Sequence, residues 1–268
     1  MFTDYYGLSF NPFDKQNIKE RDAFRSRDHK EMLSRLEYLK TVRGIGVFTA
    51  RPGMGRTYAL RCFMNGLNPN QYQTAYISLS TISVTEFYRE FCTLLGLEAS
   101  GNKTGMFRAL QERVYYLYRE KKQPLVLAID EAQYLNYNIL RDLKMLLNHN
   151  YDSLNCFSLV LVGEPYLNHI LDKQVHEALR QRITVHYNYE GLSDQEVPDY
   201  ICHKLELAGG SRSILEGGAL SAVHGYSEGN AGKIDNLMTD ALTIGAQQEQ
   251  HCISAEIVMA AANNQALT

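Results

Sequence analysis

The chain has 268 residues, of which 45% are hydrophobic, so it can bury the core of one large or two small domains and is not a disordered chain. Its net charge of -3 gives no overall attraction to polyanions, which argues against a protein that coats DNA by charge alone. Its five cysteines follow no metal-binding spacing, and we expect reduced thiols. No stretch approaches the roughly 20 apolar residues of a spanning helix. We therefore expect a cytoplasmic protein with no membrane partner.

The first 13 residues are rich in aromatic side chains and are interrupted by glycine and proline, so we expect neither a helix nor an alternating strand there. Two interpretations remain open: an aromatic strap on the domain that follows, or the border of an adenine pocket. The next segment, 28–39, places Met32, Leu36 and Leu39 at helical spacing and predicts a helix before the first strand.

A phosphate-binding loop is predicted at 49–58, because the apolar run 45–48 leads into it and a helical pattern follows it. In the usual loop, Gly is followed by four residues and then Gly-Lys-Ser/Thr, and the backbone N–H groups bind phosphates. Here Ala50 stands at the first Gly position and Arg56 at the Lys position. The alternative is a glycine-rich turn without a ligand. The residues expected to bind nucleotide are Pro52, Gly53, Met54, Gly55, Arg56, Thr57 and Tyr58.

The second half of the predicted site lies further along the chain. Residues 125–129 have the pattern of a buried strand that ends in Asp130 and Glu131, the Walker B arrangement of nucleoside triphosphatases. We expect Asp130 and the Thr57 hydroxyl to hold Mg²⁺, and Glu131 to orient or deprotonate the attacking water. Two solvated carboxylates at a strand end are the alternative. The presence of both motifs in this order argues against it.

The rest of the first 192 residues predicts an α/β fold. Strand patterns at 74–79, 157–162 and 183–187 alternate with helical patterns at 84–95 and 106–118, which indicates a parallel sheet with helices on both faces. A further set of residues lines one helix face that is either core or a binding surface: Ile139, Leu140, Leu143, Leu146 and Leu147.

Beyond residue 192 only helices are predicted. Ser193 and Glu196 form a capping box at the start of one helix, and Ser254 is the expected N-cap of the last. The other helical patterns lie at about 216–226, 231–248 and 254–264. We therefore expect an α/β nucleotide-binding domain with its aromatic strap over 1–192 and an all-helical lid over 193–268.

Several segments together resemble the ExeA-type AAA+ ATPases, a group similar to the TniB, TnsC and IstB transposition ATPases. They are Tyr6-Gly7-Leu8, Asn11-Pro12-Phe13, the phosphate loop, and the run from Leu127 to Gln133. The resemblance covers almost the whole chain and implies a P-loop NTPase (AAA+) fold with ATP and Mg²⁺ as cofactors.

The resemblance also implies roles for residues outside the two motifs. Glu164 stands where the family has a Gln at the sensor 1 strand, and we expect it at the catalytic site. Arg182, with Arg180 as the reserve, is the candidate for an Arg that acts on the nucleotide of a neighbouring protomer. Gly232 occupies the position of the sensor 2 Arg, so that contact is expected to be missing unless Lys233 replaces it.

Because Arg56 is planar and bulkier than Lys, nucleotide binding is expected to survive while hydrolysis becomes slow. The first hypothesis is an ATP-dependent homo-oligomer, a ring or filament, that binds double-stranded DNA without sequence preference and recruits a transposase. The alternatives are an ATPase for secretion or envelope assembly and a nucleotide-binding scaffold with little hydrolysis. Basic residues on the predicted helix 106–118 and after it are either DNA contacts or a solvated face: Arg108, Arg113, Arg119, Lys121 and Lys122.

Overall fold

The computed structural model divides into two compact units. It describes residues 1–14, 19–78, 81–147 and 154–265. An α/β unit comprises Glu31–Arg51 and Arg56–Tyr189, and a helical unit comprises Met1–Lys30, Pro52–Gly55 and Glu190–Thr268. Four residues of the phosphate loop therefore group with the helical unit.

The expectation that the N-terminal strap belongs to the α/β domain was wrong. Leu8 and Phe13 are buried in the core of the helical unit, where they cover apolar side chains that its helices leave open. Ser9 fixes the segment there, because its backbone N–H and its hydroxyl both donate to the Ala208 carbonyl. The segment also contains a short helix that was not expected, α1 (Phe2–Tyr6), which ends at Gly7 in the left-handed conformation.

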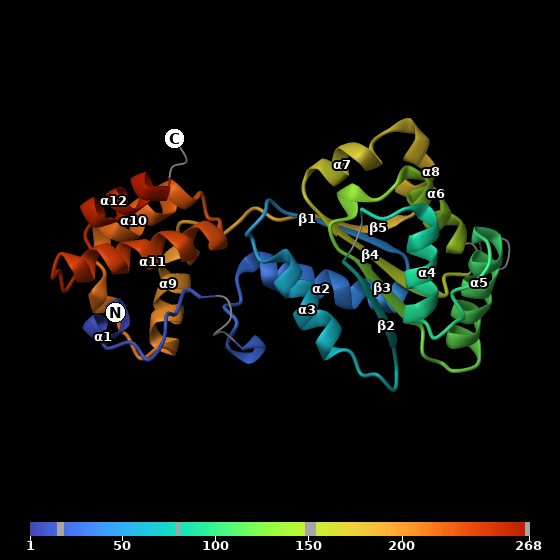
Figure 1. Ribbon diagram of the computed structural model, residues 1–268, viewed down its shortest axis with the longest axis horizontal. Coiled ribbons are helices and arrows are strands. Elements are labelled where there is room, and N and C mark those ends of the chain that lie inside the picture. The colour runs from blue at the N-terminus through green and yellow to red at the C-terminus, as the bar shows by residue number, and fades with distance from the viewer. Residues whose placement is uncertain (15–18, 79–80, 148–153, 266–268) are drawn as a thin grey trace. The chain divides into compact units, whose positions relative to one another are not determined.

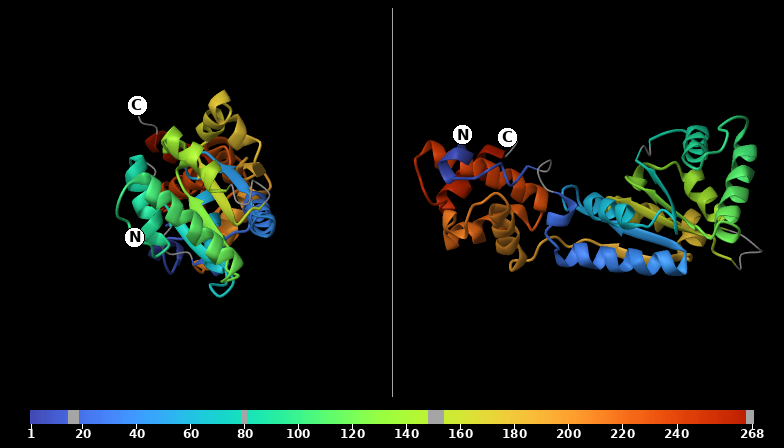
Figure 2. Two further views of the ribbon diagram at one scale, coloured as in Figure 1. Left: turned by 90° about the vertical axis from the view of Figure 1, so that its right-hand side faces the viewer. Right: turned by 90° about the horizontal axis from the view of Figure 1, so that it is seen from below.

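The α/β unit contains one parallel sheet of five strands in the order β2-β3-β4-β1-β5, which confirms the predicted fold class (Figure 1). The strands are β1 (Ile45–Thr49), β2 (Gln73–Ile77), β3 (Leu125–Ile129), β4 (Phe157–Gly163) and β5 (Ile183–Asn188). The strand expected at 74–79 ends at Ile77, and Leu79 lies outside the described residues. Further views show the strands running in one direction (Figure 2).

Helices cover both faces of this sheet (Figure 1). Successive strand residues point to opposite faces. In β4, Leu159 packs with α4, α5 and α6, whereas Val160 packs with α2 and α3. The helices are α2 (Arg27–Val42), α3 (Arg56–Gly66), α4 (Val84–Leu94), α5 (Lys103–Arg119), α6 (Tyr137–Leu146), α7 (Tyr166–Leu171) and α8 (Glu177–Arg180). Short 3-10 turns are η1 (Glu20–Asp22), η2 (Ala132–Tyr134) and η3 (Gln174–His176).

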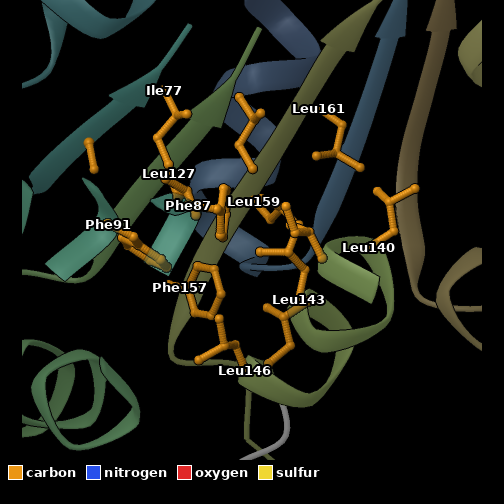
Figure 3. Close-up of a cluster of buried hydrophobic side chains, with 14 of the residues drawn as sticks. Ile77, Phe87, Phe91, Leu127, Leu140, Leu143, Leu146, Phe157, Leu159 and Leu161 are labelled. Carbon is orange, nitrogen blue, oxygen red and sulfur yellow. The ribbon is translucent and has the colours of Figure 1, made fainter. Parts of the chain in front are cut away.

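The apolar face of α6 is core and not a binding surface. Leu140, Leu143 and Leu146 are buried against the sheet, together with Phe87 and Phe91 of α4 (Figure 3). Burial of such side chains contributes about 1.5–3 kcal/mol each, so this face fixes the position of α6 rather than leaving it open to a partner.

The helical unit contains α9 (Glu196–Leu207), α10 (Gly217–Ser227), α11 (Ala231–Gln247), α12 (Ala255–Gln265) and η4 (Arg212–Ile214). Both predicted caps are confirmed. The Ser193 hydroxyl accepts from the Glu196 backbone N–H while Glu196 Oε2 accepts from the Ser193 backbone N–H, and the Ser254 hydroxyl accepts from the Ile257 N–H. No helix in the described part of the chain is long and apolar enough to cross a bilayer.

Candidate functional site

The predicted phosphate loop leaves the sheet at the carboxyl end of β1. Ala50 is buried, and its N–H donates to the Gly163 carbonyl at 3.1 Å, which fixes the start of the loop beside the end of β4. Gly53 and Gly55 both have φ of +86°, a conformation that residues with a Cβ rarely adopt. The helix α3 then begins at Arg56. The chain therefore forms the strand, loop and helix that a phosphate-binding loop requires.

Asp130 lies at the carboxyl end of β3 and accepts two hydrogen bonds through Oδ2. The Thr57 hydroxyl donates at 2.9 Å and the Tyr76 hydroxyl at 3.2 Å. Burial raises the pKa of Tyr76 to about 12, and the negative charge of Asp130 adds to that rise, so the phenol remains a donor at neutral pH. The sequence predicted correctly that Thr57 and Asp130 lie together. Tyr76 was missed, because its approach depends on β2 lying beside β3.

Arg56, at the position of the usual Lys, points toward the two Walker B carboxylates. Its Nη2 donates to Glu131 Oε1 at 2.5 Å, its Nη1 donates to the Ala50 carbonyl at 2.7 Å, and its Nε lies 4.0 Å from Asp130 Oδ1. The side chain is only 7% exposed. Its guanidinium is therefore engaged by the protein itself, which a single ammonium could not do in the same way.

Glu131 has its second oxygen occupied as well. Gln133 Nε2 donates to Glu131 Oε2 at 2.7 Å, and Gln133 Oε1 accepts from the Glu164 backbone N–H at 3.0 Å. Gln133 is buried, and a Cβ on Gly163 would lie 2.6 Å from its Oε1, so this arrangement needs glycine at the end of β4. Glu164 thus joins the site through its backbone. Gln133 was not predicted, although its place two residues after Glu131 was a signal.

Arg182 is not brought to these residues within one chain. It precedes β5 and so lies at the amino end of the parallel strands, whereas Arg56, Asp130 and Glu131 lie at the carboxyl end. Its Nη1 donates to the Lys144 carbonyl at 3.5 Å. The reserve candidate, Arg180, pairs with Asp172.

Two further loop residues, Pro52 and Gly53, contact the start of α11 within the helical unit. Asn230 Nδ2 donates to the Pro52 carbonyl at 2.8 Å, and the Gly232 N–H donates to the Gly53 carbonyl at 2.9 Å. A Cβ at Gly232 would lie 3.0 Å from Gly53 Cα. Gly232 stands at the position of the sensor 2 Arg in the family that this chain resembles, and its backbone packs closely on Gly53. The neighbouring Lys233 is exposed.

Comparison with known proteins agrees with this geometry. The family model described as AAA domain matches residues 39–171. General secretion pathway protein A of Aeromonas hydrophila is 30% identical over 250 residues, which cover 92% of this chain and 45% of that protein. This chain is an AAA+ protein of the ExeA-like type. It spans less than half the length of that relative.

The fold of this AAA+ chain also resembles solved structures at low sequence identity. Cdc6p from Pyrobaculum aerophilum has a TM-score of 0.69 and 17% identity over 96% of this chain and 71% of its own. The Aeropyrum pernix ORC1 protein, solved in complex with DNA, has a TM-score of 0.58 and 15% identity over 91% of this chain and 66% of its own. These likenesses confirm the P-loop NTPase fold.

Proposed function

We propose that this AAA+ chain is a nucleotide-gated switch that binds ATP with Mg²⁺, hydrolyses it slowly, and in the ATP state assembles on duplex DNA to regulate a transposase. The observation that carries the nucleotide-gated part of the proposal is the contact of Arg56 with Glu131 beside the Thr57–Asp130 pair, and the DNA and transposase part follows from the resemblance to the transposition ATPases. The pair that we propose to hold Mg²⁺ lies beside the carboxylate that we propose as the base, and that carboxylate is paired with a cation of the same chain.

The residues present fit a magnesium nucleotide. Thr57 and Asp130 supply oxygen atoms, which Mg²⁺ prefers, and water and phosphate oxygens would supply its other ligands. A Cβ on Gly55 would meet nothing within 4 Å, so the loop is open at that point. The first N–H groups of a helix have no intrahelical acceptor, and at the start of α3 such groups suit phosphate oxygens. When bound, Mg²⁺ would neutralise charge that develops on the phosphates.

Slow turnover follows from the state of Glu131. To accept a proton from water, the Glu131 carboxylate must direct a lone pair at that water, and hydrogen bonds that hold both of its oxygens restrict how it can turn. Both oxygens are hydrogen-bonded, one to Arg56 and one to Gln133. We infer that hydrolysis waits until Arg56 leaves Glu131, and that phosphate groups are the anions able to attract it away.

Assembly is proposed to place Arg182 of one protomer at the nucleotide of the next. Arg182→Ala is expected to leave folding and nucleotide affinity nearly intact, because the side chain is partly exposed and remote from Asp130. ATP-dependent oligomers should become smaller, and turnover should fall by at least about tenfold. Light scattering with and without ATP measures the first effect. An unchanged ATP-dependent mass in the variant contradicts the assignment.

The function as a whole is tested by titrating labelled duplex DNA with the protein, with and without ATP, at low and moderate salt. Because the monomer is acidic overall, binding should need ATP, should rise steeply with protein concentration, and should weaken strongly with salt. Sequence should matter little, because phosphate contacts carry no sequence information. Tight binding by nucleotide-free monomer, or no binding in any nucleotide state, contradicts the transposition role.

A second candidate function is an ATPase for secretion or envelope assembly. The observation that favours it is the 30% identity to General secretion pathway protein A. This second candidate function uses the same nucleotide site with the same slow turnover, but it predicts no ATP-dependent binding to duplex DNA. The same titration therefore separates the two candidates.

A further inference from the structure

We propose that the amino-terminal edge of the α/β sheet is the surface that contacts the phosphate backbone of duplex DNA. The proposal rests on the proposed function and names the surface that carries it out. We call this surface the basic edge and define it by Arg43, Arg119, Lys121 and Lys122. It lies at the opposite end of the strands from Asp130, so it can bind DNA while the nucleotide site is filled.

The sheet brings these four residues together although they are far apart in the sequence. Arg43 stands two residues before β1. Arg119 is the last residue of α5, and Lys121 and Lys122 stand between α5 and β3. In the sheet, β3 and β1 are separated only by β4. Neighbouring strands lie about 4.8 Å apart, so the two groups are separated by about 10 Å. The same length of duplex axis carries about six phosphate charges.

The two arginines are held by neighbouring aromatic and backbone groups. Arg43 stacks over the Tyr118 ring with its Cζ 4.9 Å from the centroid, and its Nε donates to the Asn155 carbonyl at 2.9 Å. Arg119 is hydrogen-bonded to Tyr115. A guanidinium fixed in this way loses less conformational entropy when it binds a phosphate, and its planar donors can contact two phosphate oxygens at once.

Arg43 and Arg119 both lie close enough to Cys156, which directly precedes β4, for their charges to act on its thiol. Burial raises the pKa of the Cys156 thiol to about 11, and the charges of Arg43 and Arg119 act against that rise. Among the carboxylates of the described residues nearest in sequence, Glu37 is paired with Lys40, and Glu120, whose charge acts on Arg119, offsets one of the four positive charges. The basic edge is therefore a local positive surface on a chain whose net charge is -3.

This surface differs from the whole set of basic residues on α5. Arg108 lies 11 residues before Arg119, about 16 Å away along the helix axis. Arg113 packs over Tyr116, at 5.6 Å from the ring centroid, and is partly buried. Of the basic residues of α5, only Arg119 at its carboxyl end belongs to the basic edge. Arg108 is therefore suitable for a control variant that removes positive charge elsewhere.

The test compares two variants that each remove three positive charges. The edge variant combines Arg119→Gln, Lys121→Gln and Lys122→Gln. The control variant combines Lys30→Gln, Arg89→Gln and Arg108→Gln, which are exposed and lie outside the basic edge. Arg43 is left unchanged, because it adopts a φ of +53° and packs on Tyr118.

With ATP present, the edge variant should bind duplex DNA at least about tenfold more weakly than the wild type. The slope of log K against log salt should flatten by about 0.9 for each phosphate that is no longer neutralised, or up to about 2.7 per protomer. In the edge variant, the ATP-induced rise in melting temperature and the ATP-dependent oligomerisation measured without DNA should not change. The control variant should retain most of the affinity and the salt slope. Wild-type affinity and slope in the edge variant, or equal weakening in both variants, would overturn the proposal.

Vesicles with phosphatidylserine provide the other phosphate-bearing surface. If the wild type binds these vesicles and not duplex DNA, and the edge variant no longer binds vesicles, the basic edge faces a membrane and the DNA assignment is overturned. If the wild type binds DNA but the edge variant does so equally well, the proposed function stands and only this surface is wrong. The two failures are thereby distinguished.

Discussion

Glu131→Gln is expected to bind ATP about as well as the wild type and to reduce turnover by at least about 100-fold. An amide of the same shape can still contact Arg56, but it cannot accept a proton from the attacking water. The carboxylate is 40% exposed, so water can reach it once Arg56 has moved away. Phosphate release and ATP-dependent melting shifts, measured on the same preparations, test the two halves of this expectation.

Asp130→Ala is the matched control for that experiment. Asp130 is buried and accepts from Thr57 and Tyr76, so its removal should abolish the magnesium-dependent part of the melting shift. Glu131→Gln should keep that shift. If Glu131→Gln turns over at the wild-type rate, Glu131 has no catalytic role. If Asp130→Ala keeps the full shift, Asp130 does not hold the metal.

The sequence predicted those parts of the site whose functional residues lie within one short, recognisable motif. The loop that ends in Thr57 and the strand that ends in Asp130 each have a recognisable local pattern, and parallel pairing brings both to one edge. Tyr76 has no such pattern, and Gln133 is marked only by its place two residues after Glu131. One depends on which strands are neighbours, and the other on a turn that begins with Glu131 at a φ of +51°.

The sequence also could not predict where the N-terminal aromatics pack, because an apolar surface is available on either unit. Leu8 and Phe13 are buried in the helical unit, where Phe13 also lies against Lys204 of the buried Lys204–Asp235 pair. The Lys204 ammonium lies over the Phe13 ring, which is a favourable cation–π contact. The choice is therefore decided by tertiary contacts rather than by the pattern of the first 13 residues.

The absence of an Arg at position 232 now has a steric reason. The N–H of Gly232 donates to the Gly53 carbonyl, and any side chain there would be forced against Gly53 Cα. The loop and the first turn of α11 therefore share a contact that the substitution of a larger residue would break. We expect that restoring an Arg at this position would not speed hydrolysis.

Arg56→Lys is expected to raise turnover by about tenfold, which corresponds to about 1.4 kcal/mol of barrier. In the wild type the planar guanidinium contacts the Ala50 carbonyl and Glu131 through two different nitrogens. A Lys presents one compact ammonium and cannot keep both contacts in the same geometry. Glu131 should then spend more time free to accept a proton. Steady-state phosphate release at saturating ATP measures the change.

Two further variants show whether the gain passes through Glu131. Arg56→Met should free Glu131 but weaken ATP binding, because it removes the charge that phosphate attracts, so its turnover should stay below that of Arg56→Lys. In the double variant of Arg56→Lys with Glu131→Gln, turnover should fall to the level of Glu131→Gln alone, since two residues in direct contact do not act additively. A double variant that keeps the tenfold gain, or an Arg56→Lys protein slower than the wild type, contradicts the inference that Arg56 restrains Glu131.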